Sequence, residues 1–263
     1  MSQRAASAIA RDVVVDGNRL ETVRYDGDPA RPAVVMLHEG LGSISLWRDF
    51  PERVRDRTRC TTVAYSRYGY GRSDALREKR EPEYMHHEGE VVLPALLRAL
   101  GIDRPVLFGH SDGASIALIA AGAHPALARA LILEAPHVFV EEISVRSIAE
   151  AKTAFASTDL PAKLARHHAD AAATFYGWND VWLDPRFRAW NVEEYAARVR
   201  VPVLLIQGDA DEYGTLAQLE SIAARVPGTE TLLVPGAGHS PHRDAADLVL
   251  DRIASFVETI VKL

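Results

Sequence analysis

Short apolar runs recur along the chain and alternate with longer segments of helical periodicity. The first two, 12–15 and 20–25, flank Asp16-Gly17 and predict a hairpin with a tight turn. The later runs are almost wholly apolar, which is typical of strands that are buried on both faces of a parallel sheet. These runs span 32–37, 61–65, 105–108, 130–133, 201–206 and 230–234.

The segments between these strands repeat apolar residues at helical spacing. One of them is predicted to kink at Pro94 and to end at Gly101. Strands alternating with helices predict an α/β fold, with a mostly parallel sheet of about eight strands and helices on both faces. The predicted helices span 46–55, 84–100, 114–121, 143–156, 161–176, 215–225 and 241–261.

The segment 137–199 differs from the rest of the chain. It is rich in alanine, histidine, arginine and aromatic residues, has helical periodicity, and contains no strand-like run. The strand pattern resumes only after it. We therefore expect a helical cap subdomain at 137–199, inserted into a core domain formed by 1–136 and 200–263.

Composition narrows the class of protein. The 263 residues are 48% hydrophobic and 25% charged, which is ordinary for a globular enzyme, and the net charge of −6 argues against a nucleic-acid partner. The single cysteine, Cys60, excludes an internal disulfide and fits a reducing compartment. The N-terminus lacks the apolar core of a secretory signal, and no run approaches the length of a membrane span. We expect a cytoplasmic protein with no membrane partner; the sequence leaves its oligomeric state open.

The strongest chemical signal is Gly109-His110-Ser111-Asp112-Gly113. It lies between the run 105–108 and a small-residue helix, and strand, tight turn and helix are the setting of a nucleophile elbow. Glycines are needed there because Cβ atoms two residues to either side of the serine would clash with the strand and the helix. Ser111 is therefore the candidate nucleophile; the alternative is an ordinary turn serine that caps a helix.

A serine nucleophile requires a base and an acid that orients the base. His239 follows the run 230–234 in a loop with glycines that let it bend back over the sheet. Asp211 follows the run 201–206, and its Gly-x-x-Asp spacing favours it over Asp209. Glu134, after the strand that follows the elbow helix, is a further candidate for the acid.

These motifs together resemble the α/β-hydrolase fold superfamily, in particular its capped serine hydrolases of the esterase and ring-cleavage-product types. The resemblance covers nearly the whole chain, and the candidates follow the Ser…Asp…His order of that fold. The motifs that carry it are His38–Gly40, Gly69–Asp74, the elbow, Gly208–Asp211 and Gly236–His239.

The resemblance implies a role for each matching position. Ser111 is the nucleophile, Asp211 the acid and His239 the base, and the backbone N–H groups of Gly40 and Asp112 form the oxyanion hole. One position departs from the family, because many relatives have His-Gly where this chain has a glutamate after His38. That residue, Glu39, either contacts or repels a polar substrate, or points away and makes a structural hydrogen bond.

Further side chains have roles that the sequence leaves open. Trp178 and Trp182 lie in the predicted cap, where together with Glu39 they are candidates for the substrate pocket, although tryptophans are more often core residues. Histidines are adjacent at 86–87 and at 167–168, but no cysteine lies near either pair, as would be typical of a zinc site. We expect neither a metal site nor a cofactor.

The predicted function is hydrolysis of a small, partly apolar ester, lactone or related acyl compound through an acyl-enzyme. The same residues suit carbon–carbon bond hydrolysis of aromatic ring-cleavage products, or acyl transfer if the cap excludes water. A ligand-sensing receptor built on the same fold is the alternative that is not an enzyme. Dehalogenase and epoxide hydrolase activities are disfavoured, because those relatives have a carboxylate where this chain has Ser111.

Overall fold

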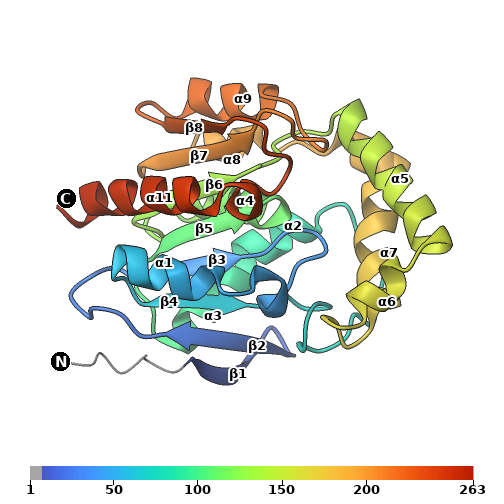
Figure 1. Cartoon of the computed structure of the whole chain (residues 1–263), viewed down its shortest axis with the longest axis horizontal. Coiled ribbons are helices and arrows are strands. Elements are labelled where there is room, and N and C mark those ends of the chain that lie inside the picture. The colour runs from blue at the N-terminus through green and yellow to red at the C-terminus, as the bar shows by residue number, and fades with distance from the viewer. Residues whose placement is uncertain (1–7, 263) are drawn as a thin grey trace.

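The computed structural model describes residues 8–262, which form one eight-stranded sheet flanked by helices (Figure 1). The strand order is β1-β2-β4-β3-β5-β6-β7-β8. β1 and β2 form an antiparallel hairpin and β2 pairs antiparallel with β4, whereas all later pairings are parallel. The predicted fold class is thus confirmed. The strands are β1 (Ile9–Val15), β2 (Asn18–Tyr25), β3 (Val34–Leu37), β4 (Thr62–Tyr65), β5 (Val106–His110), β6 (Ala130–Glu134), β7 (Val203–Gly208) and β8 (Glu230–Val234).

Helices cover both faces of the sheet and one end of it. In Figure 1, α5, α6 and α7 gather at the right-hand end, away from the helices that cover the faces. The helices on the faces bury the sheet between two apolar layers. The helices are α1 (Phe50–Thr58), α2 (Tyr84–His87), α3 (Leu93–Leu100), α4 (Asp112–Ala123), α5 (Glu142–Ser157), α6 (Leu160–Leu164), α7 (Ala171–Trp182), α8 (Glu193–Ala196), α9 (Ala217–Arg225), α10 (Pro241–Asp244) and α11 (Ala246–Val261).

Strand β5 shows why the central strands read as unbroken apolar runs. Leu107 packs into the layer that contains residues of α3 and α4, while Val106 and Phe108 pack into the layer that contains residues of α1 and α11. Because successive side chains of a strand point to opposite faces, both faces must be apolar when both are covered.

Two helices predicted in the N-terminal half are interrupted. The predicted helix 46–55 is a 3-10 turn, Ile44–Trp47, followed by α1, because Arg48 adopts a positive φ of 55° between them. The predicted helix 84–100 is helical throughout, but a π-helical turn at Glu88–Val92 separates α2 from α3. Pro94 is the second residue of α3, just after this turn. Because proline has no N–H to donate to the preceding helical turn, it interrupts the backbone hydrogen bonding of the continuous helix there.

Two later predicted helices are also each split in two. The predicted helix 161–176 is α6 and α7, because the chain turns between them and Asp170 caps α7 by accepting from the backbone N–H of Ala173 at 2.9 Å. The predicted helix 241–261 is α10 and α11, which separate at Ala245, where φ is −140° and ψ is 52°. Apolar periodicity continues across each break, so it could not reveal the break.

The strand register brings the loops after six parallel strands, β3 to β8, to one edge of the sheet. Leu37 of β3 pairs with Gly109 of β5, and His110 of β5 pairs with Glu134 of β6. The pairing continues through β7 to β8. Because these strands are parallel, the loops that follow them meet at the carboxyl edge, where ligands bind in such sheets. The segment that contains α5 to α8 leaves from the same edge.

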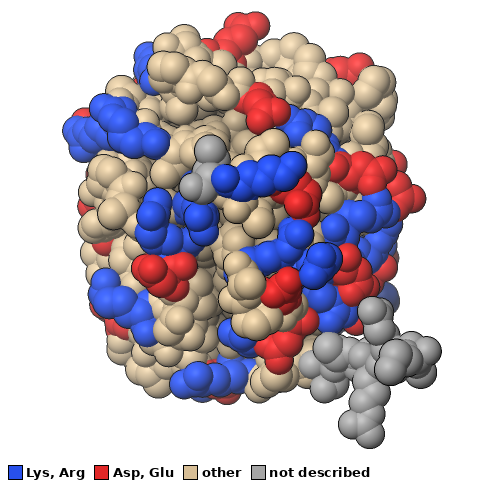
Figure 2. All heavy atoms as spheres, turned by 90° about the vertical axis from the view of Figure 1, so that its left-hand side faces the viewer, with Lys and Arg blue, Asp and Glu red and all other residues tan. Residues whose placement is uncertain are grey.

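Charged residues of both signs are interspersed on the face turned away from α5, α6 and α7 (Figure 2). The net charge of −6 is therefore not gathered into a single patch on that face. Among residues 8–262, no helix combines the length and the apolar character that crossing a membrane requires.

Candidate active site

Ser111 occupies a strained turn between β5 and α4. Its φ is 54° and its ψ is −118°, and its backbone N–H donates to the carbonyl of Glu134 at 2.8 Å. A Cβ atom on Gly109 would lie 2.3 Å from the carbonyl oxygen of Gly113, and one on Gly113 would lie 2.1 Å from that of Leu37. Both glycines are therefore required by close approach of the backbone, as the sequence predicts.

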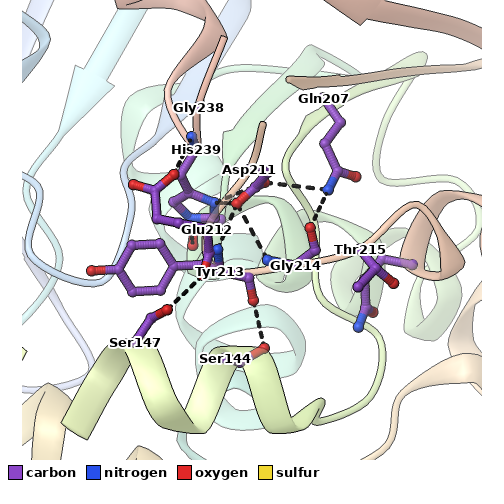
Figure 3. Close-up of polar contacts among 12 residues, drawn as sticks. Ser144, Ser147, Gln207, Asp211, Glu212, Tyr213, Gly214, Thr215, Gly238 and His239 are labelled. Carbon is purple, nitrogen blue, oxygen red and sulfur yellow. Dashed lines mark hydrogen bonds and ion pairs between the residues drawn. The ribbon is translucent and has the colours of Figure 1, made fainter. Parts of the chain in front are cut away.

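The structure brings the side chains of Ser111, His239 and Asp211 together. Oγ of Ser111 lies 2.9 Å from Nε2 of His239. Nδ1 of His239 lies 2.9 Å and 3.0 Å from the two carboxylate oxygens of Asp211 (Figure 3). A carboxylate can only accept, so the Nδ1 proton faces Asp211, and the neutral ring is free to accept at Nε2.

Asp211 is held by the loop that follows β7. Its carboxylate accepts from the backbone N–H groups of Tyr213 at 2.8 Å and Gly214 at 3.2 Å, and from Nε2 of Gln207 at 3.3 Å (Figure 3). Burial raises the pKa of this carboxyl, but the hydrogen bond and charge of His239, with the amide of Tyr213, outweigh burial and lower it. The carboxylate therefore stays ionised and keeps the imidazole in one orientation.

The two rival acids bind other partners. Asp209 accepts from the backbone N–H of Gly236 at 2.7 Å. Glu134 accepts from the backbone N–H of His242 at 2.6 Å and from its Nδ1 at 2.9 Å. Of these three carboxylates, the one bonded to the imidazole of His239 is that of Asp211.

Three neighbours fix the loop that carries His239. Nε2 of His110 donates to the backbone carbonyl of His239 at 2.7 Å. The carboxylate of Glu212 accepts from the backbone N–H of His239 at 3.1 Å. The ring of Tyr213 lies 4.8 Å from the imidazole, measured between centroids. Helix α5 supports this arrangement, because the hydroxyls of Ser144 and Ser147 donate to the carbonyls of Tyr213 and Glu212 (Figure 3).

The backbone amides of Gly40 and Asp112 are free to bind a ligand. Among the described residues, no backbone carbonyl or side chain accepts from either of them, and Asp112 is the first residue of α4. The buried guanidinium of Arg67 ties the two segments together: Nη2 donates to the carbonyl of Glu39 at 3.0 Å and lies 3.6 Å from the carboxylate of Asp112. That carboxylate also accepts from the hydroxyl of Tyr84 at 2.6 Å.

Glu39 links the loop after β3 to two other loops and also lines the cavity beside Ser111. One carboxylate oxygen accepts from Nη2 of Arg243 at 3.1 Å, and the other lies 3.5 Å from Nδ1 of His110. Burial raises the pKa of Glu39, but the close contact with Nδ1 of His110 and the charges of His110 and Arg243 hold it well below its usual value. Burial lowers the pKa of His110, but Glu39 and Glu134 outweigh burial and raise it, which agrees with an ion pair.

Glu39→Gln is expected to weaken the dependence of stability on acid pH. Because the pKa of Glu39 is lower in the folded protein, the folded state binds fewer protons there than the unfolded chain. The ionised carboxylate therefore stabilises the fold above about pH 4.5, and this contribution is lost as the pH falls below that value. Thermal unfolding followed by circular dichroism from pH 3 to pH 6 should show a steeper loss of Tm for the wild type than for Glu39→Gln. The exposed Glu220, changed to Gln, serves as the control, and equal slopes for Glu39→Gln and wild type would contradict an ionised Glu39.

A cavity of about 180 Å³ opens beside Ser111 and His239. Gly40 and Asp112 lie on one side of it, and Trp178 and Trp182 reach it from α7. The other lining residues could not be predicted from the sequence. Most of them lie in loops after the strands, where no periodicity shows which side chain faces the cavity, and Ile148 lies on α5, whose orientation over the sheet edge periodicity does not give. The available signal was closeness in sequence to a predicted site residue, as for Ser240 beside His239 and Glu212 beside Asp211. The missed residues are Leu41, His110, His137, Ile148, Glu212, Tyr213, Ser240 and Arg243.

His137 contributes an uncharged ring to this cavity. It is 3% exposed, and its ring centroid lies 5.8 Å from that of His239 and 5.2 Å from that of Trp182. Burial, and then the charge of His239, lower the pKa of His137 to about 4. The ring is therefore neutral near pH 7.

His110, Glu134 and His242 form the group of described side chains whose ligand atoms could hold a metal ion. Those atoms lie within 4.8 Å of one another, and all three residues are buried. Glu134 already accepts two hydrogen bonds from His242, and Nε2 of His110 donates to the carbonyl of His239. These contacts give the group a structural role, and the absence of a metal stays a prediction.

Comparison with known proteins places this geometry in a family. The sequence profile of the alpha/beta hydrolase family matches residues 34–252. The 2-(acetamidomethylene)succinate hydrolase of Mesorhizobium japonicum is 24% identical over 255 residues, which are 86% of this chain and 88% of that protein.

Solved structures share the fold. The enol-lactonase from Burkholderia xenovorans superposes with a TM-score of 0.75 at 20% identity, covering 94% of this chain and all of that one. The carboxylesterase CesB from Bacillus subtilis superposes with a TM-score of 0.71 at 19% identity, covering 95% and 92%. With the profile match over most of its length, this chain belongs to the alpha/beta hydrolase family and is an enzyme of that family.

Proposed function

We propose that this enzyme is a serine hydrolase of small, partly apolar esters, lactones or related acyl compounds. The observation that carries the proposal is the run of hydrogen bonds from Ser111 through His239 to Asp211, with 2.9 Å at each step, on the wall of a cavity. A weak nucleophile, a base within reach of its proton and an oriented acid are the parts that nucleophilic acyl transfer needs.

In the first half of the reaction, Oγ of Ser111 attacks the carbonyl carbon while Nε2 of His239 takes the hydroxyl proton. The C=O electron pair moves onto oxygen, and the backbone N–H groups of Gly40 and Asp112 stabilise the resulting oxyanion. The tetrahedral intermediate then collapses and expels the leaving alcohol or enol. His239 returns its proton to that leaving group.

In the second half, water takes the place of the leaving group. His239 removes a proton from the water, the hydroxide attacks the acyl-enzyme, and the same two amides hold the second oxyanion. Collapse releases the acid and restores the hydroxyl of Ser111. Asp211 remains ionised throughout and stabilises the imidazolium that forms in each half.

The proposed substrate class follows from the size and lining of the cavity. About 180 Å³ is less than the roughly 300–1,000 Å³ of pockets that hold drug-sized ligands, so a short acyl group fits best. Trp178, Trp182 and Ile148 supply an apolar wall from α5 and α7, within the segment 137–199 that we propose as a cap. The names of two structural relatives, an enol-lactonase and a carboxylesterase, support cyclic and open esters.

A panel of p-nitrophenyl esters tests this function. Acetate, butyrate, octanoate and dodecanoate esters are compared, together with small lactones followed by pH-stat titration. We expect the highest kcat/KM for the shorter esters and labelling of the protein by a fluorophosphonate. Absence of both turnover and labelling would instead favour a ligand-binding receptor.

Trp182→Ala is expected to change the preference among acyl groups. Trp182 is 2% exposed, lines the cavity, and donates from its indole nitrogen to the hydroxyl of Tyr84 at 3.2 Å. Its loss enlarges the cavity, so kcat/KM for longer acyl groups should rise relative to kcat/KM for acetate. The expected change in discrimination corresponds to about 1–3 kcal/mol of activation free energy.

Trp190→Ala is the matched control for Trp182→Ala, because Trp190 is a buried tryptophan of the same segment that does not line the cavity. Thermal unfolding establishes that both variants are folded at the assay temperature. A decrease by one common factor for all esters would make Trp182 a core residue and contradict its role as a pocket wall.

A further inference from the structure

The indole nitrogen of Trp178 lies directly against the loop that carries Gly40. A Cβ atom on Gly40 would lie 2.1 Å from Nε1 of Trp178, and 2.4 Å and 2.8 Å from Cδ1 and Cε2. The edge of the indole that bears the N–H therefore meets Gly40, and any larger residue at position 40 would collide with it.

The N–H of Trp178 donates no hydrogen bond within residues 8–262, although the residue is only 6% exposed. The N–H groups of Trp47 and Trp190 are also unpartnered, but they are sealed within the protein. That of Trp178 is not sealed, and the residue lines the cavity together with Ser111 and Gly40. A donor in this position is available to a substrate.

Helix α7 is anchored to the loops around the site, so the indole is held in place. Nε2 of His168, just before α7, donates to the carbonyl of Leu41, and its Nδ1 accepts from the backbone N–H of Gly71, each at 3.0 Å. The hydroxyl of Thr174 donates to the carbonyl of Gly69 at 2.7 Å. These bonds fix the position of α7 relative to the residue after Gly40, which preorganises the donor.

We propose that the N–H of Trp178 is a third donor to the carbonyl oxygen of the substrate, beside the backbone amides of Gly40 and Asp112. This inference rests on the proposed function. A substrate carbonyl oxygen that accepts a hydrogen bond from the backbone N–H of Gly40 would lie beside the indole N–H of Trp178, because that edge of the indole packs against Gly40. When Ser111 attacks and the C=O electron pair moves onto that oxygen, a fixed donor stabilises the negative charge more than it stabilises the neutral carbonyl. The cap then takes part in bond breaking as well as in substrate choice.

The test removes the N–H in two ways. Trp178→Phe removes the donor together with part of the ring, and β-(3-benzothienyl)alanine, incorporated at position 178, retains the bicyclic ring but has sulfur in place of N–H. Trp190→Phe is the matched control, because it removes an unpartnered indole N–H that lies outside the cavity. The acylation rate constant and KM are measured with p-nitrophenyl acetate, together with the inhibition constant of a trifluoromethyl ketone, whose adduct with serine carries an oxyanion.

Both variants at position 178 are expected to lower the acylation rate constant by about 10–10²-fold, near the lower end of what one oxyanion donor contributes. The affinity for the trifluoromethyl ketone should fall by a similar factor, while KM changes by less than about threefold, because the loss is confined to the charged state. Trp190→Phe should retain the wild-type values.

Wild-type acylation in the benzothienyl variant would overturn the inference, as would a rise in KM without a loss of rate. Failure of the proposed function has a different signature, because the wild type itself would then give neither a burst of p-nitrophenol nor an acylated Ser111.

Discussion

Ser111→Ala is expected to lower kcat/KM for p-nitrophenyl acetate by at least about 10³-fold. The substitution removes only the hydroxyl that lies 2.9 Å from Nε2 of His239, so no acyl-enzyme can form. The remaining activity comes from the amides and the cavity, which can still bind the ester and orient a water molecule.

The fold should survive this change. Alanine lacks only one atom of serine, and the backbone N–H of Ser111 still donates to the carbonyl of Glu134. Circular dichroism and thermal unfolding of Ser111→Ala should therefore resemble those of the wild type. Activity within about tenfold of wild type on several esters, measured in a preparation free of wild-type enzyme, would show that another group is the nucleophile.

Asp211→Asn is expected to lower kcat by as much as about 10⁴-fold relative to the wild type. This loss should exceed that caused by Asp209→Asn or Glu134→Gln. An asparagine amide that donates to Nδ1 of His239 would place the ring proton on Nε2, where it blocks proton transfer from Ser111. Asp209→Asn loses only a charged acceptor for the N–H of Gly236, so we expect at most about a tenfold decrease. Steady-state kinetics with one chromogenic ester compares the variants.

Glu134→Gln completes this comparison. The carboxylate of Glu134 is buried and accepts two hydrogen bonds from His242. Glu134→Gln should therefore lower the free energy of unfolding while changing kcat little. If Asp209→Asn proved the most harmful substitution, or if Glu134→Gln were severe while both aspartate variants were mild, the assignment of Asp211 as the acid would be wrong.

The sheet and the elbow could be predicted because both have local causes. Buried parallel strands must be apolar on both faces, and the turn at Ser111 needs glycines wherever the backbone approaches closely, as at Gly113 against Leu37. The helix breaks could not be predicted, because apolar periodicity continues through them. Arg48 shows this well, since its positive φ has no signal in its residue type.

The choice among the three candidates for the acid shows what motif spacing can predict and what it cannot. Asp209 and Asp211 follow the same strand two residues apart, and spacing alone favours the second. The structure adds which carboxylate faces His239. No sequence pattern predicts the contact of Trp178 with Gly40, because it depends on the direction in which α7 crosses the loops at the sheet edge.

Covalent labelling with a fluorophosphonate is the most direct measurement of the central claim, that Ser111 is a nucleophile activated by His239. Intact-protein mass spectrometry should show one added phosphonyl group, peptide mapping should place it on Ser111, and Ser111→Ala should not be labelled. His239→Ala should be labelled far more slowly than the wild type, because the hydroxyl has lost its base. A label on another residue, or equal labelling of Ser111→Ala, would contradict the account.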